Sequence, residues 1–87
     1  MEFNNNDDLR RFAKLLSEKM ESLGNSSMAH DLKEWNDTSF TSASEFLGEL
    51  RMILERVKEF KAIDIELKQN VSDCIAAINK AFGQCRN

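Results

Sequence analysis

The absence of proline constrains this chain more than any residue that it contains. None of its 87 residues is proline, so no ring removes a backbone hydrogen bond or blocks the interior of a helix. From Asp8 to Phe82, apolar residues recur at spacings of three and four, which is the period of an amphipathic α-helix. The chain is therefore predicted to be all-α.

Two helices are predicted in the first half of the chain from periodicity and capping residues. The first begins after Asn6 or Asp7, both good N-caps, and ends at Gly24. The second begins at Ser26 or Ser27. Their apolar stripes are Leu9, Phe12, Leu16, Met20 and Leu23 in the first helix, and Met28, Leu32 and Trp35 in the second.

The second half of the chain predicts two more helices. Residues 42–45, Ser-Ala-Ser-Glu, fit a capping box that starts a helix over about 43–60. The pattern then changes register, and Asp64 is a plausible cap for a fourth helix that ends at Gly83. A single long helix over 43–82 is the alternative. The apolar stripes are Phe46, Leu47, Leu50, Ile53, Leu54, Val57 and Phe60, then Leu67, Val71, Cys74, Ile75, Ile78 and Phe82.

Short connections favour antiparallel neighbours, so the expected fold is a small antiparallel bundle of about four helices, or two stacked helical hairpins. With 41% hydrophobic residues, the chain can build one core, and a single domain over 1–87 is predicted, with flexible ends at about 1–7 and 84–87. The N-terminus has no basic and apolar leader, and no apolar run approaches the roughly 20 residues that cross a bilayer. We therefore expect a cytoplasmic protein.

Two cysteines and one glycine have structural interpretations. Cys74 lies in an apolar stripe and is predicted to be a core thiol, whereas Cys85 lies in a predicted tail as a free thiol. Eleven helical residues would hold them roughly 16 Å apart, too far for a disulfide unless the tail folds back. Gly48 lies inside a predicted helix, which suggests close backbone approach by a neighbouring helix, or else by a partner chain.

Catalytic motifs are absent from the sequence. His30 and Glu34 are one helical turn apart but lack the second histidine of a zinc-binding helix, and a surface histidine is the better interpretation. Ser39, Ser42 and Ser44 occur where turns and caps need hydroxyl groups, without the glycines of a nucleophile elbow. We expect no catalytic residue, no metal, no cofactor and no enzymatic activity.

Nucleic acid and membranes are disfavoured as partners. The net charge is −3 and acids occur in every predicted helix, which opposes binding to phosphates. The basic cluster Arg10, Arg11 and Lys14 is interpreted as a solvated face, and no helix pairs a lysine-rich face with a bulky apolar one. A protein partner remains.

Acidic residues gather in sequence around the connection between the second and third predicted helices. Together with one aromatic and one methionine, they form the candidate partner-binding set: Asp31, Glu34, Asp37, Phe40, Glu45, Glu49 and Met52. Met52 would add an adaptable apolar contact to an acidic patch. Two simpler interpretations stay open: a solvated acidic face, and a Phe40 ring that folds back over the core.

The segments 23–32, Leu-Gly-Asn-Ser-Ser-Met-Ala-His-Asp-Leu, and 39–50, Ser-Phe-Thr-Ser-Ala-Ser-Glu-Phe-Leu-Gly-Glu-Leu, carry a family resemblance. They resemble small helical immunity proteins of bacterial polymorphic and contact-dependent toxin systems. The resemblance covers roughly the first two-thirds of the chain and implies a cytoplasmic protein that neutralises a cognate toxin domain by occlusion. An acidic patch would suit a basic nuclease-type toxin.

Other functions are kept as alternatives. A structural or regulatory bundle, such as an adaptor or phage accessory protein, would form a homo-oligomer through the wide apolar face of the third helix. A DNA-binding antitoxin would need a basic recognition helix, and the sequence has none.

Overall fold

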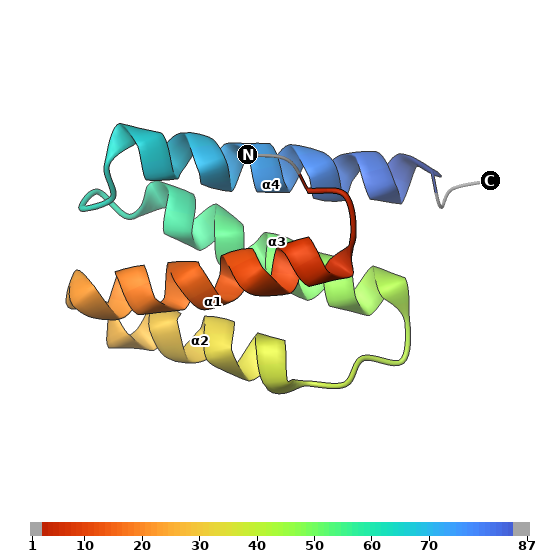
Figure 1. Ribbon diagram of the computed structural model, residues 1–87, viewed down its shortest axis with the longest axis horizontal. Helices are drawn as coiled ribbons and strands as arrows, with labels where there is room; N and C mark the ends of the chain where they lie inside the picture. Colours follow the sequence, from red (N-terminus) through yellow and green to blue (C-terminus); the bar gives the residue numbers. More distant parts are fainter. Residues whose placement is uncertain (1–2, 85–87) are drawn as a thin grey trace. The chain divides into compact units, whose positions relative to one another are not determined.

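Four α-helices joined by short connections make up the computed structural model, which describes residues 3–84 (Figure 1). They are α1 (Asn6–Ser22), α2 (Ser26–Asp37), α3 (Ala43–Glu59) and α4 (Ile65–Gln84). No strand occurs in this range. The prediction of an all-α chain with about four helices is confirmed.

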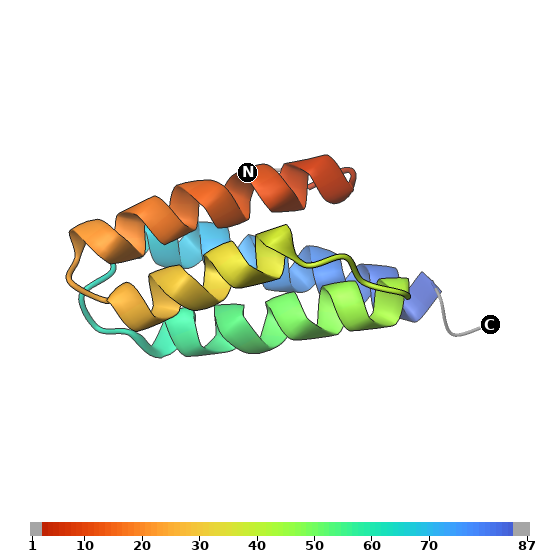
Figure 2. The ribbon, with the colours of Figure 1, turned by 90° about the horizontal axis from the view of Figure 1, so that it is seen from below.

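The described residues divide into two compact units, 3–39 and 40–84. The first is a hairpin in which α1 and α2 run antiparallel, and the second is a hairpin of α3 and α4 (Figures 1 and 2). Each hairpin has its own connection, caps and polar contacts between its helices. That the two form a single domain stays a prediction.

The connection between α1 and α2 is a tight turn built on Gly24. This glycine has a φ of +82°, a conformation that residues with a Cβ adopt only with strain. The Gly24 N–H donates to the Glu21 carbonyl at 3.1 Å and the Asn25 N–H to the Met20 carbonyl at 2.8 Å, the two bonds of a Schellman motif. The Asn25 side chain then accepts from the Met28 N–H at 3.1 Å and caps α2. One asparagine therefore closes one helix and opens the next.

The start of α1 differs from the prediction by one or two residues. The cap is Asn5, whose side chain accepts from the Asp8 N–H at 2.9 Å, rather than Asn6 or Asp7. This choice places Asp7 and Asp8 in the first turn, where carboxylates stabilise the positive end of the helix. Residues 6, 7 and 84, which belong to the ends predicted to be flexible, are helical. The remaining end residues, 1–2 and 85–87, lie outside the described range.

Polar contacts clasp α1 to α2. Arg10 donates to the Asn36 carbonyl at 2.6 Å, and the Asn36 amide donates back to the Arg10 carbonyl at 3.0 Å. The Arg10 guanidinium also lies 5.6 Å from the centre of the Trp35 ring, and Lys33 pairs with Glu21 at 3.0 Å. The prediction that Arg10 belongs to a solvated face is therefore wrong.

Separate caps start α3 and α4. The Ser42 hydroxyl accepts from the Glu45 N–H at 3.2 Å, as predicted. The reciprocal half of the capping box is not formed within residues 3–84; the Glu45 carboxylate accepts from the Thr41 hydroxyl at 3.4 Å instead. Asp64 caps α4 by accepting from the Leu67 N–H at 2.7 Å. The alternative of one helix over 43–82 is wrong, because residues 60–64 form a turn.

The predicted apolar stripes are buried along most of their length. Leu23, Met28, Phe60 and Phe82, most of them near helix ends, are half-buried. The Cys74 side chain is completely buried, which confirms the core thiol, and Cys85 lies outside the described residues. The fully buried large side chains are Leu16, Met20, Leu32, Leu50, Leu54, Ile78, Val57 and Val71.

Gly48 is not explained by close packing within the chain, so the predicted close approach of a neighbouring helix is wrong, whereas close approach of a partner chain stays a prediction. A Cβ built at this position would meet Phe82 Cζ at 3.8 Å, an ordinary contact, and its φ is not positive. Because glycine in a helix interior costs about 0.8–1 kcal/mol relative to alanine, we expect Gly48→Ala to raise the free energy of unfolding by up to about 1 kcal/mol. Thermal unfolding followed by circular dichroism measures this gain.

Gly24→Ala is the matched control. Gly24 also has open space around it, but its positive φ makes any Cβ strained. We expect this variant to lose about 1 kcal/mol, so the two Gly→Ala changes should shift the midpoint in opposite directions. A loss of stability in Gly48→Ala would mean that the position does need glycine.

Candidate functional site

The candidate partner-binding residues fall in different hairpins. Asp31, Glu34 and Asp37 belong to α2, whereas Phe40 precedes α3 and Glu45, Glu49 and Met52 lie on it. The two groups differ in how many of their carboxylates are exposed and unpaired.

The α2 group does not form one uniform acidic face. At about 100° per residue, Asp31 and Asp37 are offset by about 120° around the helix. Asp31 is half-buried, and the Glu34 carboxylate lies 3.0 Å from His30 Nε2. His30 and Glu34 are therefore an exposed i,i+4 pair, in keeping with a surface histidine. Only Asp37 is exposed with no ion pair or hydrogen bond of its side chain within residues 3–84.

The α3 group forms a continuous exposed line. Glu45, Glu49 and Met52 are spaced at i, i+4 and i+7, so they lie on one side of the helix. Both glutamates are exposed, and the Met52 side chain is 64% exposed. Within residues 3–84, the Glu49 side chain has no ion pair or hydrogen bond. We call Glu45, Glu49 and Met52 the α3 face.

Phe40 packs on its own hairpin. Its ring meets the buried ring of Phe46 edge to face, with centroids 5.8 Å apart. The ring is half-buried. This geometry favours the interpretation that the Phe40 ring folds back over the core.

Arg51, the cation closest in sequence to the α3 face, is directed elsewhere. Its guanidinium donates to Asn79 Oδ1 at 2.8 Å and lies 4.9 Å from the centre of the Phe82 ring. Both contacts clasp α3 to α4. The glutamates at positions 45 and 49, one helical turn apart, therefore repel each other at a cost of a few tenths of a kcal/mol, which a cationic partner would reverse.

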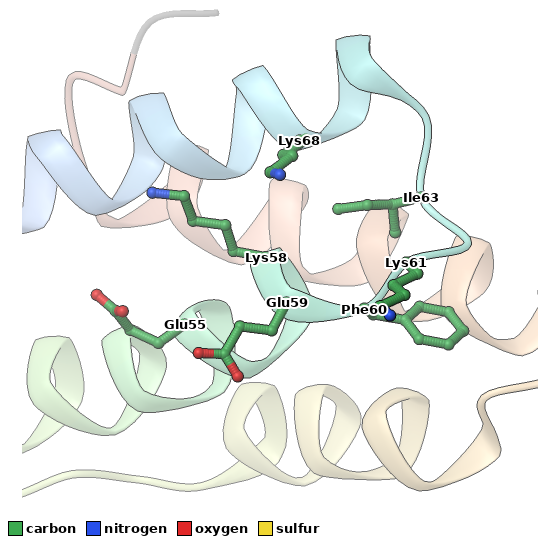
Figure 3. Close-up of a pocket in the computed structure, with 7 residues that line it drawn as sticks. All are labelled: Glu55, Lys58, Glu59, Phe60, Lys61, Ile63 and Lys68. Carbon is green, nitrogen blue, oxygen red and sulfur yellow. The ribbon is translucent and has the colours of Figure 1, made fainter.

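A second candidate site, which the sequence analysis missed, is a hollow at the turn between α3 and α4 (Figure 3). Three lysines and two apolar residues contribute to its lining, together with two glutamates. The only sequence signal is the alternation of Lys and apolar residues around the break at 60–64, and such a pattern is common in helix termini. The lining residues are Glu55, Lys58, Glu59, Phe60, Lys61, Ile63 and Lys68.

Neither a metal-binding cluster nor a membrane-spanning helix occurs within residues 3–84. Within residues 3–84 no three His, Cys, Asp or Glu side chains lie close enough together to hold a metal ion. In the same range, every helix is too short or too polar to cross a bilayer.

Comparison with known protein families, characterised proteins and solved structures finds no match to this chain.

Proposed function

We propose that this chain is a non-enzymatic protein-binding module, most simply a cytoplasmic immunity protein that neutralises a basic toxin domain by occlusion. The observation that carries the proposal is the α3 face, where a 64% exposed methionine continues a line of two exposed glutamates. Methionine suits adaptable contacts, and uncompensated carboxylates accelerate association with a basic partner. The resemblance to immunity proteins supplies the class of partner.

The α3 face also suits a mechanism of occlusion. A nuclease presents a basic surface to the phosphates of its substrate, and an acidic helix competes for the same surface. Glu45 and Glu49 would take the place of phosphates, and Met52 would contact an apolar side chain beside them. No chemical step is needed, so a stoichiometric complex is sufficient.

The alternative of a self-associating bundle has less support. The alternative depends on the apolar stripe of α3, which lies apart from the α3 face defined above. Phe46, Leu50 and Leu54 of this stripe are already buried within the single chain. The exposed large apolar side chains among residues 3–84 are Leu15, Met52 and Ile65. Light scattering of the pure protein would support this alternative only if it gave a stable homo-oligomer.

Charge reversal on the α3 face tests the proposal. We expect Glu45→Lys/Glu49→Lys to weaken binding of the cognate domain by about tenfold or more, since each exposed charge contributes up to about 1 kcal/mol and reversal turns attraction into repulsion. The partner is first captured from the source cells and purified, and affinities are then measured by calorimetry. Co-expression with the same domain should restore cell growth for the unmodified chain and not for the variant.

The matched control is Glu18→Lys/Glu66→Lys. These glutamates are also exposed, but they lie on α1 and α4 rather than on α3. The control makes the same change in net charge. If both variants weaken binding of the domain equally, the loss of affinity is due to overall charge and not to the α3 face. Binding that survives reversal at 45 and 49, with the fold unchanged, would show that the α3 face is not the contact surface.

A further inference from the structure

The hollow at the α3–α4 turn is open to solvent and has room for a small molecule. It has a volume of about 490 Å³ and is formed by the last turn of α3, the connecting residues and the first turn of α4. Small-molecule sites typically have volumes of about 300–1,000 Å³. The connection is ordered by backbone bonds, because the Phe60 N–H donates to the Val57 carbonyl at 3.0 Å and the Ile63 N–H to the Phe60 carbonyl at 3.4 Å.

The three lysines that line this hollow have no polar partner within residues 3–84. Lys58, Lys61 and Lys68 are exposed, and within residues 3–84 their ammonium groups form no ion pair or hydrogen bond. Figure 3 shows the Lys58 and Lys68 side chains extending from α3 and α4 into the space between these helices. Unpaired lysines that line one hollow make its potential more positive, which favours an anion bound there.

The glutamates of the hollow do not neutralise these lysines. Figure 3 shows the Glu59 carboxylate extending from α3 away from α4, whereas Lys58 extends toward α4. Neither Glu55 nor Glu59 forms an ion pair with a lysine of the hollow within residues 3–84.

Apolar surface adjoins the lysines. Phe60 and Ile63 line the hollow and are only half-buried, so part of each side chain stays in contact with water. Covering such surface is favourable by about 25 cal/mol per Å². A ligand that carried only a charge would leave this surface exposed, and one that carried only an alkyl chain would not use the lysines.

We propose that this hollow binds a small molecule that has an anionic head group on an apolar chain. Lys58 and Lys68 hold the head group, and Phe60 and Ile63 contact the chain. A carboxylate and a phosphate monoester share this chemistry. None of the α3-face residues lines the hollow, so this proposal is tested independently of the toxin-binding proposal.

Nuclear magnetic resonance titration of the full chain tests this site with octanoate, octyl phosphate, octylammonium and 1-octanol as probes. We expect saturable shifts at residues 58–68 with both anions, with a dissociation constant of about 1 mM for a ligand of this size. The tighter of the two anions identifies the head group. Raising the ionic strength should weaken both, because the lysines are exposed.

Variants separate a specific site from general attraction to the chain. Lys58→Gln/Lys68→Gln should weaken octanoate or octyl phosphate binding by about fivefold or more, as expected for the loss of two exposed charges. Lys80→Gln, an exposed lysine of α4 outside the hollow, should leave the affinity unchanged. The proposal is overturned by equal binding of octylammonium, by shifts confined to other residues, by an unchanged double variant, or by no binding at all.

Discussion

Leu54→Ala should lower the free energy of unfolding by about 2–5 kcal/mol. The Leu54 side chain is fully buried in α3. Its truncation removes apolar contacts and leaves a cavity that the surrounding helices fill only in part. A chain of this length has a total stability of about 4–13 kcal/mol, so the variant would keep only part of that margin. Urea unfolding followed by circular dichroism measures the difference.

Met52→Ala is the matched control for this prediction. It removes a side chain of similar size two residues away on the same helix, but Met52 is 64% exposed. We expect a change within about 0.5 kcal/mol, because exposed substitutions away from caps and cores have small effects. Similar losses in both variants would mean that burial on α3 does not determine stability.

The Leu54→Ala experiment also tests the prediction of a single domain. Trp35 is the only tryptophan of the chain and lies in the α1–α2 hairpin, whereas Leu54 lies in the other hairpin. If the two hairpins unfold together, the tryptophan fluorescence and the helical signal of the variant should shift to the same lower midpoint. A fluorescence midpoint that stays where it was, while part of the helical signal is lost earlier, would show that the hairpins unfold separately.

Most of the secondary structure could be predicted because its signals are local. The stripe from Leu9 to Met20, the Gly24 stop and the Asp64 cap each depend on residues within one or two turns, and each is found where expected. The predicted start of α1 differs from the observed one because the run of Asn and Asp residues offers several possible caps at adjacent positions. Asn5 also places two carboxylates in the first turn, a gain that the cap residue alone does not reveal.

The contacts between helices could not be read in the same way. Arg10 and Asn36 are 26 residues apart, and nothing in the sequence pairs them. For that reason Arg10 was assigned to a solvated face, although its guanidinium closes the α1–α2 hairpin. The hollow between Lys58 and Lys68 was missed for the same reason, since their convergence depends on the turn that joins α3 to α4.

The candidate site was predictable in part. Periodicity alone places Glu45, Glu49 and Met52 on one side of a helix, and their exposure agrees with it. Whether a carboxylate is free depends on its neighbours, and Glu34 lies against His30 whereas Glu49 has no such partner within residues 3–84. Phe40 is half-buried because its ring packs against the buried ring of Phe46, and the sequence of the loop alone does not predict this contact.

Alkaline pH should destabilise the chain through Cys74. The thiol is completely buried, and burial raises the pKa of Cys74 from 9.0 to about 12, because the thiolate loses its solvation. In the unfolded chain the same thiol ionises near pH 9, so above that pH the folded state holds a proton that the unfolded state has released. The free energy of unfolding is therefore unaffected below pH 9 and falls as the pH rises from 9 toward 12, by about 1.4 kcal/mol per unit. At pH 10.5 the loss should reach about 2 kcal/mol.

Cys74→Ala separates this effect from every other titration. The chain contains no tyrosine, and its lysines and Cys85 are the same in both proteins, so their contributions cancel in the comparison. Urea unfolding with a reductant present, at pH 7.5, 9 and 10.5, should give two curves of stability against pH that run parallel up to pH 9 and then converge. The variant has no buried thiol to keep protonated, so its stability should fall less steeply in the alkaline range. Curves that stay parallel to pH 10.5 would mean that the thiol at position 74 ionises as readily in the folded chain as in the unfolded one, and that its burial does not control its chemistry.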